Sequence, residues 1–571
     1  MDTCVCFGVR ARPSQVVLCE KCCLHGQRNT MTDTNNNNNS NNINSSVRRQ
    51  WRSKRDKLPL TSCSSSPNPL HSRRRQSKAL QRHANDSPSG GLQSLLPSLI
   101  GVAVLACGVM AKMGFRGRAS VAGIDLGTTN SVICVQSPAK GVGDIQCVPD
   151  PFTKSPIVPS VVSFLEPYER KVGPSSKVPS LLNPHPSFVV VGSAAKRRID
   201  SHPHHTLYHA KRVLGRSLDD TAVEELRKEV EFQVVDDHVT GDVAFSIPET
   251  LSIPNTMIRP HHVGSYVVNH LIQITKQFLG HENIKSAVIC VPAKFNEQQI
   301  RMTHQAFKDA GVSVARVVEE PTAAALAYGL HRKAGVDYIL VYDFGGGTLD
   351  VSLLHVSDGF VDVMGSDGDD RLGGADFDAA VAHFLLEKRG GNEIVQRTTK
   401  DLHQLEGSTK GVADLEEKLS TSCPALRTTP LCTVSSFHTI GEQLKIALSE
   451  FPNHDGKAEA ECLSSPKHVD RSSLSMEQFC ASLEPFRLEL TSQEFDHAVQ
   501  SLYDRSITPL QRLLADLDLK HDSIDEIVMV GGTTRMPQIR MLVRNALPSA
   551  QLNTHIDPDI TVAYGAASVI D

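Results

Sequence analysis

The chain has 571 residues, with 59 Lys+Arg, 63 Asp+Glu and a formal net charge of −4. Residues 1–91 carry 15 basic and 5 acidic side chains, whereas residues 92–571 carry 44 and 58. An acidic main body argues against nucleic acid as a partner, because phosphate binding needs a basic face. A hydrophobic content of 40% with 5% aromatic residues is typical of a globular body, not of a fibrous or multispan membrane protein.

Residues 1–91 have the composition of a disordered, basic, low-complexity arm. They contain the asparagine run 35–39, serine-rich tracts and the arginine cluster 73–75. So few apolar side chains cannot form a core. Cys19 and Cys22 have zinc-like spacing, but no second pair completes four ligands, so we expect unstructured cysteines.

The first long apolar run covers residues 95–111, inside a segment 92–113 that we interpret as a signal peptide or signal anchor. Eleven Lys/Arg side chains lie between residues 48 and 82, on its N-terminal side. Because basic residues stay on the cytosolic side, this excess predicts a translocated body. We therefore expect a protein of the endoplasmic reticulum lumen, or one associated with microsomes.

Three other interpretations of this segment stay open. It could form a buried helix, or belong to a transit peptide that directs the chain to mitochondria. It could also come from an incorrect gene model, since a start at Met110 would give a cytosolic protein. The cysteines do not decide the compartment, because the seven after residue 111 show no paired spacing.

The body opens with an apolar strand, 121–126, that runs through Asp125 into a Gly-Thr-Thr turn and a second strand. The same design recurs at 338–354, where Asp343 precedes Gly-Gly-Gly-Thr. The two aspartates are 218 positions apart. The repeat predicts an α/β protein with two duplicated lobes, one hairpin in each, and a cleft between them.

The chemistry of these turns points to bound phosphate. Glycines let backbone amides approach phosphate oxygens, and threonine hydroxyls add donors. A carboxylate at a strand end can hold the hydrated magnesium ion that bridges two phosphates. A third strand, 526–530, ends in Gly531 and Gly532 before a helix that starts at Pro537. Such glycines would let a nucleoside lie against backbone, with Arg535 beside it.

Several motifs then identify a family. They are GIDLGTTNS (123–131), YHAKRVLG (208–215), VPAKF (291–295), VEEPTAAALAYGL (318–330), YDFGGGTLDVSLL (342–354), LGGADFD (372–378), IVMVGGTTRMP (527–537) and DPDITVAYGAA (557–567). In this order they closely resemble the ATPase domain of the heat shock protein 70 family, over about residues 119–571. The resemblance implies a two-lobed, actin-like ATPase built from duplicated ribonuclease H-like domains, with ATP in the central cleft.

The resemblance also implies cofactors and roles. ATP and Mg²⁺ would be the cofactors, with Asp125 and Asp343 around the metal. The catalytic residues would be Lys211, Asp343, Glu320, Thr348 and Asp350. Nucleotide-binding residues on the phosphate side would be Asp125, Gly127, Thr128, Thr129, Asn130, Gly345, Gly346, Gly347 and Gly374. Those on the adenosine side would be Glu442, Lys445, Ser449, Gly531, Gly532, Thr533, Arg535 and Asp559.

The sequence departs from the family pattern at several places. Ile446 stands where an arginine usually stacks on adenine, and Asn130 replaces an aromatic residue. Losing the cation–π contact should cost about 1 kcal/mol of binding free energy. Residues 401–440 and 452–475 are poorly periodic, so we expect inserted surface loops there.

The chain stops at Asp571, directly after the last motif, so we expect no substrate-binding domain. Together with the apolar segment and Ile446, this resembles the truncated, microsome-associated stress-chaperone branch of the family. The expected function is a slowly hydrolysing, chaperone-like ATPase that acts with protein partners such as co-chaperones or exchange factors. The alternatives are a nonenzymatic, ATP-dependent scaffold and a small-molecule kinase.

Overall fold

The computed structural model describes residues 121–136, 144–165, 188–199, 202–237, 240–247, 257–406, 423–450, 456–466 and 476–570. All of them belong to the second of the chain's two units, which begins at Leu92. The basic arm, its cysteines and the apolar segment 95–111 lie outside these residues, so their predictions remain predictions. Among the described helices, none has the length and apolar character needed to cross a bilayer.

The first large sheet is built around β1 (Val121–Leu126). This strand pairs antiparallel with β2 (Asn130–Gln136) and parallel with β11 (Ser286–Val291). Beyond these lie β3 (Ile145–Cys147) and β12 (Ser313–Glu319), giving the order β3-β2-β1-β11-β12, with β4 (Val158–Pro159) also on β2. Ile124, Ile133 and Ile289 are fully buried in its core.

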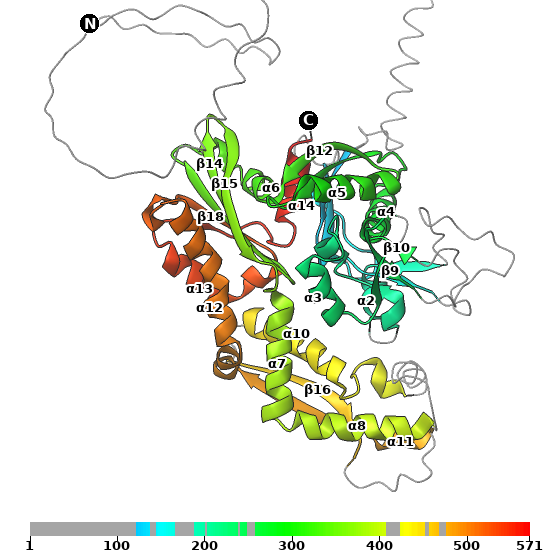
Figure 1. Cartoon of the computed structure of the whole chain (residues 1–571). Helices are drawn as coiled ribbons and strands as arrows, with labels where there is room; N and C mark the ends of the chain where they lie inside the picture. The colour runs from blue at the N-terminus through cyan, green and yellow to red at the C-terminus, as the bar shows by residue number, and fades with distance from the viewer. Residues whose placement is uncertain are drawn as a thin grey trace, which may run out of the picture. The chain divides into compact units, whose positions relative to one another are not determined.

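The second large sheet repeats this arrangement (Figure 1). Its first strand, β13 (Tyr338–Phe344), pairs antiparallel with β14 (Leu349–Ser357) and parallel with β18 (Glu526–Val530). With β15 (Phe360–Asp369) and β19 (Gln551–Asn553) the order is β15-β14-β13-β18-β19. If the five main strands of each sheet are numbered along the chain, both sheets have the same spatial order, 3-2-1-4-5. The predicted duplication is therefore confirmed.

Helices surround the two sheets. The first half of the body supplies α4 (Pro260–Leu279), α5 (Glu297–Asp309) and α6 (Glu320–Ala327). The second half supplies α7 (Gly374–Lys388), α12 (Ser492–Asp516), α13 (Pro537–Ala546) and α14 (Thr561–Ser568), of which α14 packs on the first sheet. Local sequence sets their ends: Pro260 and Pro537 occupy first turns, and Thr491 and Glu494 form a capping box before α12. Three short 3₁₀ turns, η4 (Leu330–Arg332), η6 (His521–Ser523) and η7 (Gly532–Arg535), complete the connections.

Helices α6 and α14 pack against each other with almost no space between their backbones. A Cβ on Gly565 of α14 would lie 1.8 Å from the carbonyl oxygen of Ala323 in α6. A Cβ on Gly123 of β1 would lie 2.3 Å from the amide of Ala567. Only glycine allows this approach, which joins the C-terminal helix to the first sheet.

The first lobe carries an insertion between its third strand and α4. It contains two small sheets, β6-β5-β7 and β10-β9-β8, with short helices around them. Their bounds are β5 (Val162–Phe164), β6 (Val189–Val191), α2 (Ser193–Lys196), η1 (Pro203–His205), β7 (Thr206–Leu207), η2 (Ala210–Val213), α3 (Thr221–Glu229), β8 (Gln233–Asp236), β9 (Val243–Ser246) and β10 (Met257–Ile258).

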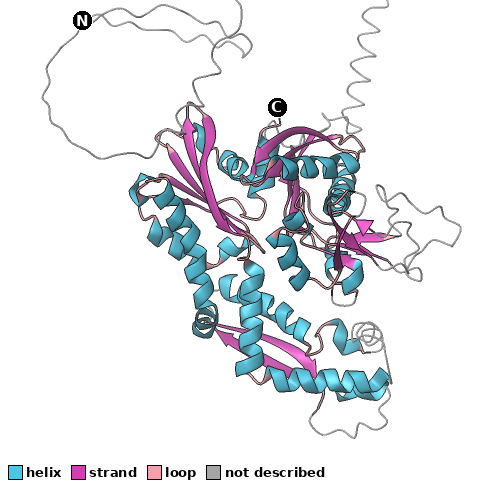
Figure 2. Cartoon of the chain, in the orientation of Figure 1, coloured by secondary structure: helices cyan, strands magenta, loops and turns pink. Residues whose placement is uncertain are grey.

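The second lobe carries a different insertion between α7 and α12, which we call the distal subdomain (residues 391–491). Helix α10 and the antiparallel pair β16–β17 pack against each other in it, with α8 alongside (Figure 2). Its elements are α8 (Gly391–Glu406), η5 (Pro424–Arg427), α10 (Val434–Glu450), β16 (Lys457–Ser464), α11 (Met476–Ser482) and β17 (Glu484–Thr491).

These elements correct the two expected surface loops. Residues 401–406 complete α8 and residues 434–440 begin α10, so the loop expected at 401–440 is wrong at both ends. The strand β16 lies inside the loop expected at 452–475. The mixed composition of β16 gave no clear strand pattern in the sequence, because Ala458 and Cys462 face the core while the residues between them are polar or small. Residues 407–422 and 467–475 lie outside the described residues.

Six of the seven cysteines after residue 111 form disulfides, which their spacing in the sequence did not indicate. The structure joins Cys134 to Cys147, Cys423 to Cys480 and Cys432 to Cys462. The first links β2 to β3, and the other two lie in the distal subdomain. The seventh cysteine, Cys290, is a buried free thiol. The sequence separations of 13, 57 and 30 residues follow no motif, so only the fold reveals the pairs.

Candidate functional site

A cleft of about 830 Å³ opens between the two large sheets, within the size range of ligand pockets. Every residue that the sequence singles out for catalysis, nucleotide binding or metal binding lines this cleft. They come from turns and helices as far apart in the sequence as Asp125 and Asp559, so the fold brings together residues that are distant along the chain. The structure thus brings the whole set together, and the individual roles stay predictions.

The two glycine–threonine turns meet on the floor of the cleft. A Cβ on Gly346 would lie 3.0 Å from the Thr129 side chain, and one on Gly373 would lie 2.3 Å from the Gly347 amide. Thr533 donates its hydroxyl to the carbonyl of Gly345 at 2.8 Å, and Ser160 donates to that of Gly127 at 2.8 Å. The turns are therefore packed too tightly for side chains, which leaves backbone and threonine groups facing the cleft.

Lys211 projects into the cleft from η2 and is held by one carboxylate. Its Nζ donates to Oε1 of Glu320 at 2.8 Å, and both side chains are mostly buried. The ring of Phe295 lies 5.7 Å from the ammonium. Burial acts to lower the pKa of Lys211, but the charges of Glu320 and Asp125 outweigh it and raise that pKa. The lysine is thus a fixed cation at neutral pH.

Four carboxylates surround this lysine. Asp343 lies opposite Asp350 in the β13–β14 register, and Asp125 is the penultimate residue of β1. Burial, with the nearby charge of Glu320, raises the pKa of Asp125 to about 7, although Lys211 opposes the shift. Burial, then Glu320 and Asp350, raises the pKa of Asp343 well above its usual value.

Burial also raises the pKa of Asp350 to about 6, while Lys294, 3.9 Å away, acts against the shift. Together, four carboxyl groups face two lysines, so the surplus is two negative charges once a bound cation has favoured the ionised form of all four. Oxygen ligands with that surplus suit a hard divalent cation such as Mg²⁺. The donor set therefore fits the expected metal, with Asp125 and Asp343 at the strand ends as its closest candidates.

The opposite wall of the cleft is formed by α10 of the distal subdomain. Nζ of Lys445 lies 2.7 Å from Asp378 of α7 and donates to the carbonyl of Gly374 at 3.1 Å. Glu442 pairs with Lys196 of the first lobe at 3.6 Å, and Ser449 donates to the carbonyl of Lys445 at 2.8 Å. This face of α10 is thus ordered by contacts with both lobes.

Arg535 lies on the third side of the cleft, beyond Gly531 and Gly532. Its guanidinium pairs with Asp559 at 2.8 Å and also contacts Asp557. These two carboxylates raise its pKa, although burial opposes them. Ile446 also lines the cleft and is 44% exposed, so its apolar side chain faces the cleft instead of packing in the core.

Sequence reasoning missed some residues that the cleft contains. Asp378 belongs to the LGGADFD motif, which marks it as a residue near the cleft, but only the fold shows that it pairs with Lys445. His209 precedes Lys211 with φ of 56°, and its buried Nδ1 has no partner among the described residues. Burial, with Arg212 nearby, lowers the pKa of His209 to about 3, so it lines the cleft as a neutral ring. No sequence signal marks this histidine.

A separate cluster, His261, His262 and Asp309, places possible metal ligands within 4.8 Å of one another between α4 and α5. Nδ1 of His262 accepts the Arg259 amide at 3.2 Å, which leaves the proton on its other ring nitrogen. The Arg259 cation also lies close enough to lower the pKa of both histidines, after burial. We assign no metal to this cluster.

Comparison with known proteins agrees with this geometry. The chain is 33% identical over 448 residues to the mitochondrial-type heat shock protein 70 of Encephalitozoon cuniculi, covering 78% of this chain and 62% of that protein. It is 33% identical to the chaperone protein DnaK of Prochlorococcus marinus and 31% to the mitochondrial iron–sulfur cluster biogenesis chaperone of Saccharomyces cerevisiae, in each case over 78% of this chain and 58% of the relative.

The chain thus spans about three fifths of the length of these relatives. It also matches the family described as Hsp70 protein, over residues 178–450 and 447–570. That family consists of chaperone ATPases with an actin-like, two-lobed nucleotide-binding domain, the fold seen here. With two matching sheets, one shared cleft and a family match over more than half of its length, the chain belongs to the Hsp70 family.

Proposed function

We propose that this protein binds ATP with Mg²⁺ in the cleft and hydrolyses it slowly, as a chaperone-type ATPase that acts through partner proteins. The observation that carries the proposal is the pair of hairpin ends, with Asp125 and Asp343 beside the Lys211–Glu320 pair in one pocket. A kinase for small molecules would share the fold, but membership of the Hsp70 family favours a chaperone.

On the phosphate side, Asp125 and Asp343 would hold the hydrated magnesium ion. When bound, the ion neutralises charge on the β- and γ-phosphates. Amides of Gly345, Gly346 and Gly347 and the hydroxyls of Thr128, Thr129 and Thr348 would position the phosphates, with Gly127, Asn130 and Gly374 beside them. The packed glycine turns support this arrangement, because backbone donors at such turns form anion-binding sites.

Lys211 would stabilise the charge that develops on the γ-phosphate, and Glu320 would hold its ammonium in place. Asp350 or Asp343 would orient the attacking water. The raised pKa values of Asp343 and Asp350 support such a role, because a carboxyl group that is partly protonated near neutral pH can accept or return a proton.

On the adenosine side, Glu442, Lys445 and Ser449 would contact the ribose and base, while Gly531, Gly532, Thr533, Arg535 and Asp559 close the opposite wall. Ile446 offers the base an apolar surface in place of a stacked cation. We retain a second candidate, a nonenzymatic scaffold whose lobes respond to bound ATP, because Ile446 departs from the family pattern at the base while the cleft can still hold a nucleotide. Hydrolysis separates the two candidates.

The direct test is single-turnover ATP hydrolysis by the purified full chain. We expect slow, Mg²⁺-dependent phosphate release that Lys211→Ala reduces at least about 100-fold. Lys285→Ala, at an exposed lysine outside the cleft, serves as the matched control and should keep the parent rate. Background release from the parent, with ATP still bound, would support the scaffold and contradict the ATPase.

We also propose that the body lies in the endoplasmic reticulum lumen, as the truncated, microsome-associated members of the family would. The three disulfides support an oxidising compartment, because cytosolic thiols are kept reduced. A mitochondrial location agrees with the names of two relatives, and a cytosolic one would follow from a start at Met110.

Protease treatment of intact microsomes tests the location. A C-terminal tag on a lumenal body is expected to resist added protease until detergent opens the vesicles. Digestion without detergent, or recovery of the chain in the mitochondrial or cytosolic fraction, would contradict the lumenal proposal.

A further inference from the structure

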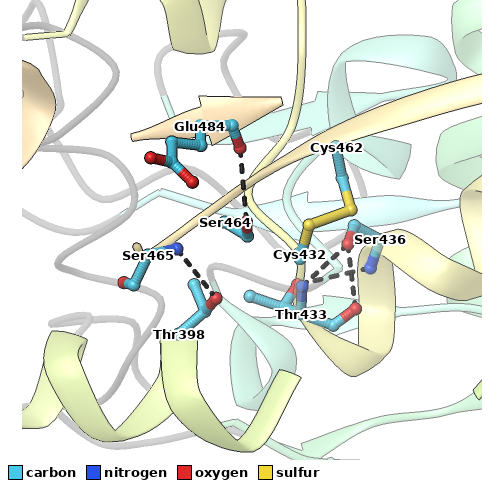
Figure 3. The surroundings of a disulfide bond; sticks show 8 residues. All are labelled: Thr398, Cys432, Thr433, Ser436, Cys462, Ser464, Ser465 and Glu484. Atoms are coloured by element: carbon cyan, nitrogen blue, oxygen red, sulfur yellow. Dashed lines mark hydrogen bonds between the residues drawn. A yellow bond between two sulfur atoms is a disulfide. The ribbon is translucent and has the colours of Figure 1, made fainter. Parts of the chain in front are cut away.

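One disulfide lies directly beside the start of the helix that forms the adenosine wall. Cys432 immediately precedes the cap of α10 and bonds to Cys462 near the end of β16 (Figure 3). Both cysteines are fully buried. The amide of Cys432 donates to the carbonyl of Leu463 at 2.9 Å, and the amide of Leu463 donates to that of Pro430 at 2.8 Å. Residues 430–432 are thus held against β16 by two backbone hydrogen bonds and one disulfide.

The next residues start the helix. The Thr433 amide donates to Oγ of Ser436 at 2.9 Å, and the Ser436 amide donates to Oγ1 of Thr433 at 3.3 Å (Figure 3). This reciprocal pair is a helix cap. Phe437 and Ile440 follow as buried core residues of the first turns. The disulfide therefore fixes the position from which α10 leaves β16.

The far half of the same helix faces the cleft. Lys445 lies 13 residues after Cys432, about 20 Å along a helix. A Cβ on Gly441 would lie 2.6 Å from the carbonyl oxygen of Asp378, so α10 touches α7 closely at this point. Because a helix transmits a tilt at one end to the other, a shift at Cys432 would move Glu442 and Lys445 relative to α7.

We propose that the Cys432–Cys462 disulfide is a positioning element for nucleotide binding, which holds α10 at the angle that presents its adenosine-facing side chains. This inference rests on the proposed function, since it assumes that the cleft binds nucleotide. Reduction by a dithiol breaks the S–S bond, gives two thiols with two protons and two electrons, and oxidises the dithiol to its own disulfide. The reduced protein would keep its phosphate site and bind adenosine less tightly.

The second disulfide of the distal subdomain provides a matched control. Cys423 precedes η5 and Cys480 lies in α11, and neither element contributes a residue to the cleft. Both bonds close chain loops in the same subdomain, so both should stabilise it. Only the bond at α10 should affect affinity.

The experiment compares the full chain with two double variants, C432S/C462S and C423S/C480S. For each, it measures the ADP dissociation constant, the single-turnover rate at saturating ATP and the melting temperature. We expect C432S/C462S to weaken ADP binding about tenfold, as expected for loss of a charged hydrogen bond, while the saturated rate stays within about twofold. C423S/C480S should lower the melting temperature and leave ADP affinity unchanged.

If C432S/C462S does not fold, the same question is answered on C423S/C480S by reduction. A graded dithiol buffer is applied, mass spectrometry of alkylated thiols follows Cys432, and ADP affinity is measured on the same samples. Affinity should fall in step with reduction of Cys432 and recover on reoxidation. Unchanged affinity across that range, or equal weakening in both double variants, would overturn the inference alone, whereas a parent that binds no nucleotide would overturn the proposed function as well.

Discussion

The two walls of the cleft are built in different ways. The phosphate side lies at the ends of two duplicated sheets, where Asp125 and Asp343 occupy equivalent strands and the glycine turns leave no space for side chains. The proposed adenosine side depends on one helix, α10, in an inserted subdomain, held by Lys445 and by a disulfide at its start, with Arg535 on the opposite wall. The comparison suggests that hydrolysis depends on the rigid duplicated core, whereas nucleotide affinity depends on how α10 is placed.

The largest expected effect lies on the phosphate side. Asp343→Asn keeps the shape of the side chain but removes a negative charge from the expected magnesium site. We expect single-turnover hydrolysis to fall at least about 100-fold, because a preorganised charge at the reacting phosphate is lost. ADP affinity in the absence of Mg²⁺ should change much less.

Asp337→Asn is the matched control, since Asp337 is exposed and outside the cleft. It should hydrolyse ATP at the parent rate. An equal loss of hydrolysis rate in both variants, or no loss in Asp343→Asn, would contradict the claim that hydrolysis depends on the phosphate side of the cleft.

A smaller effect concerns stability and pH. The pKa of Asp125 is about 7 in the folded protein against an ordinary value of 3.8. The folded state then holds a proton that the unfolded state has lost, so this group lowers stability as pH rises from about 4 to about 7. Asp125→Asn removes that group. Between pH 5 and pH 8, the parent should lose about 1–2 kcal/mol more of its unfolding free energy than the variant, allowing for partial exposure.

Urea unfolding in the presence of a metal chelator measures this difference. Adding Mg²⁺ with ADP to the parent should reduce its pH dependence, because a bound cation stabilises the charged carboxylate. Parallel pH profiles of the unfolding free energy for the parent and Asp125→Asn would show that ionisation of Asp125 does not destabilise the folded state.

The smallest expected effect lies on the adenosine side. Ile446→Arg would restore a cation that can stack on the base, since residue 446 already lines the cleft and is partly exposed. A stacked cation contributes about 1 kcal/mol, so ADP affinity should improve roughly fivefold. Calorimetric titration measures it, with Ile446→Lys as the control because an ammonium stacks less well than a guanidinium. Equal ADP affinity for Ile446→Arg and Ile446→Lys would indicate that the added positive charge attracts the nucleotide without stacking on the base.

Much of the phosphate side could be predicted from sequence. Each hairpin has a complete local pattern: a strand, an aspartate, a glycine turn and a second strand. The two sheets have the same strand order and hold these hairpins at equivalent positions, as the repeat in the sequence predicts. The motifs also named Lys211 and Glu320, and the fold brings these residues within 2.8 Å across 109 positions. The hairpins are visible in a single sequence because their pattern is local, whereas Lys211 and Glu320 were assigned only through the family resemblance.

The distal subdomain could not be predicted in the same way. Its mixed composition favoured loops where α8, α10 and β16 form, because their stability comes from contacts among distant segments. The partner of Lys445 is Asp378, 67 residues earlier, and the partner of Cys432 is Cys462. Such pairings depend on tertiary packing, and no periodicity or spacing encodes them.

The most direct test of the separation between the two walls is a double-mutant cycle of Lys211→Ala and Ile446→Arg, with single-turnover rate and ADP affinity measured for all four proteins. Independent walls predict that Lys211→Ala changes only the rate and Ile446→Arg only the affinity. The double variant should then combine both effects within about 0.5 kcal/mol. A coupling energy above about 1 kcal/mol in either quantity would show that chemistry and affinity are not divided between the sheets and α10.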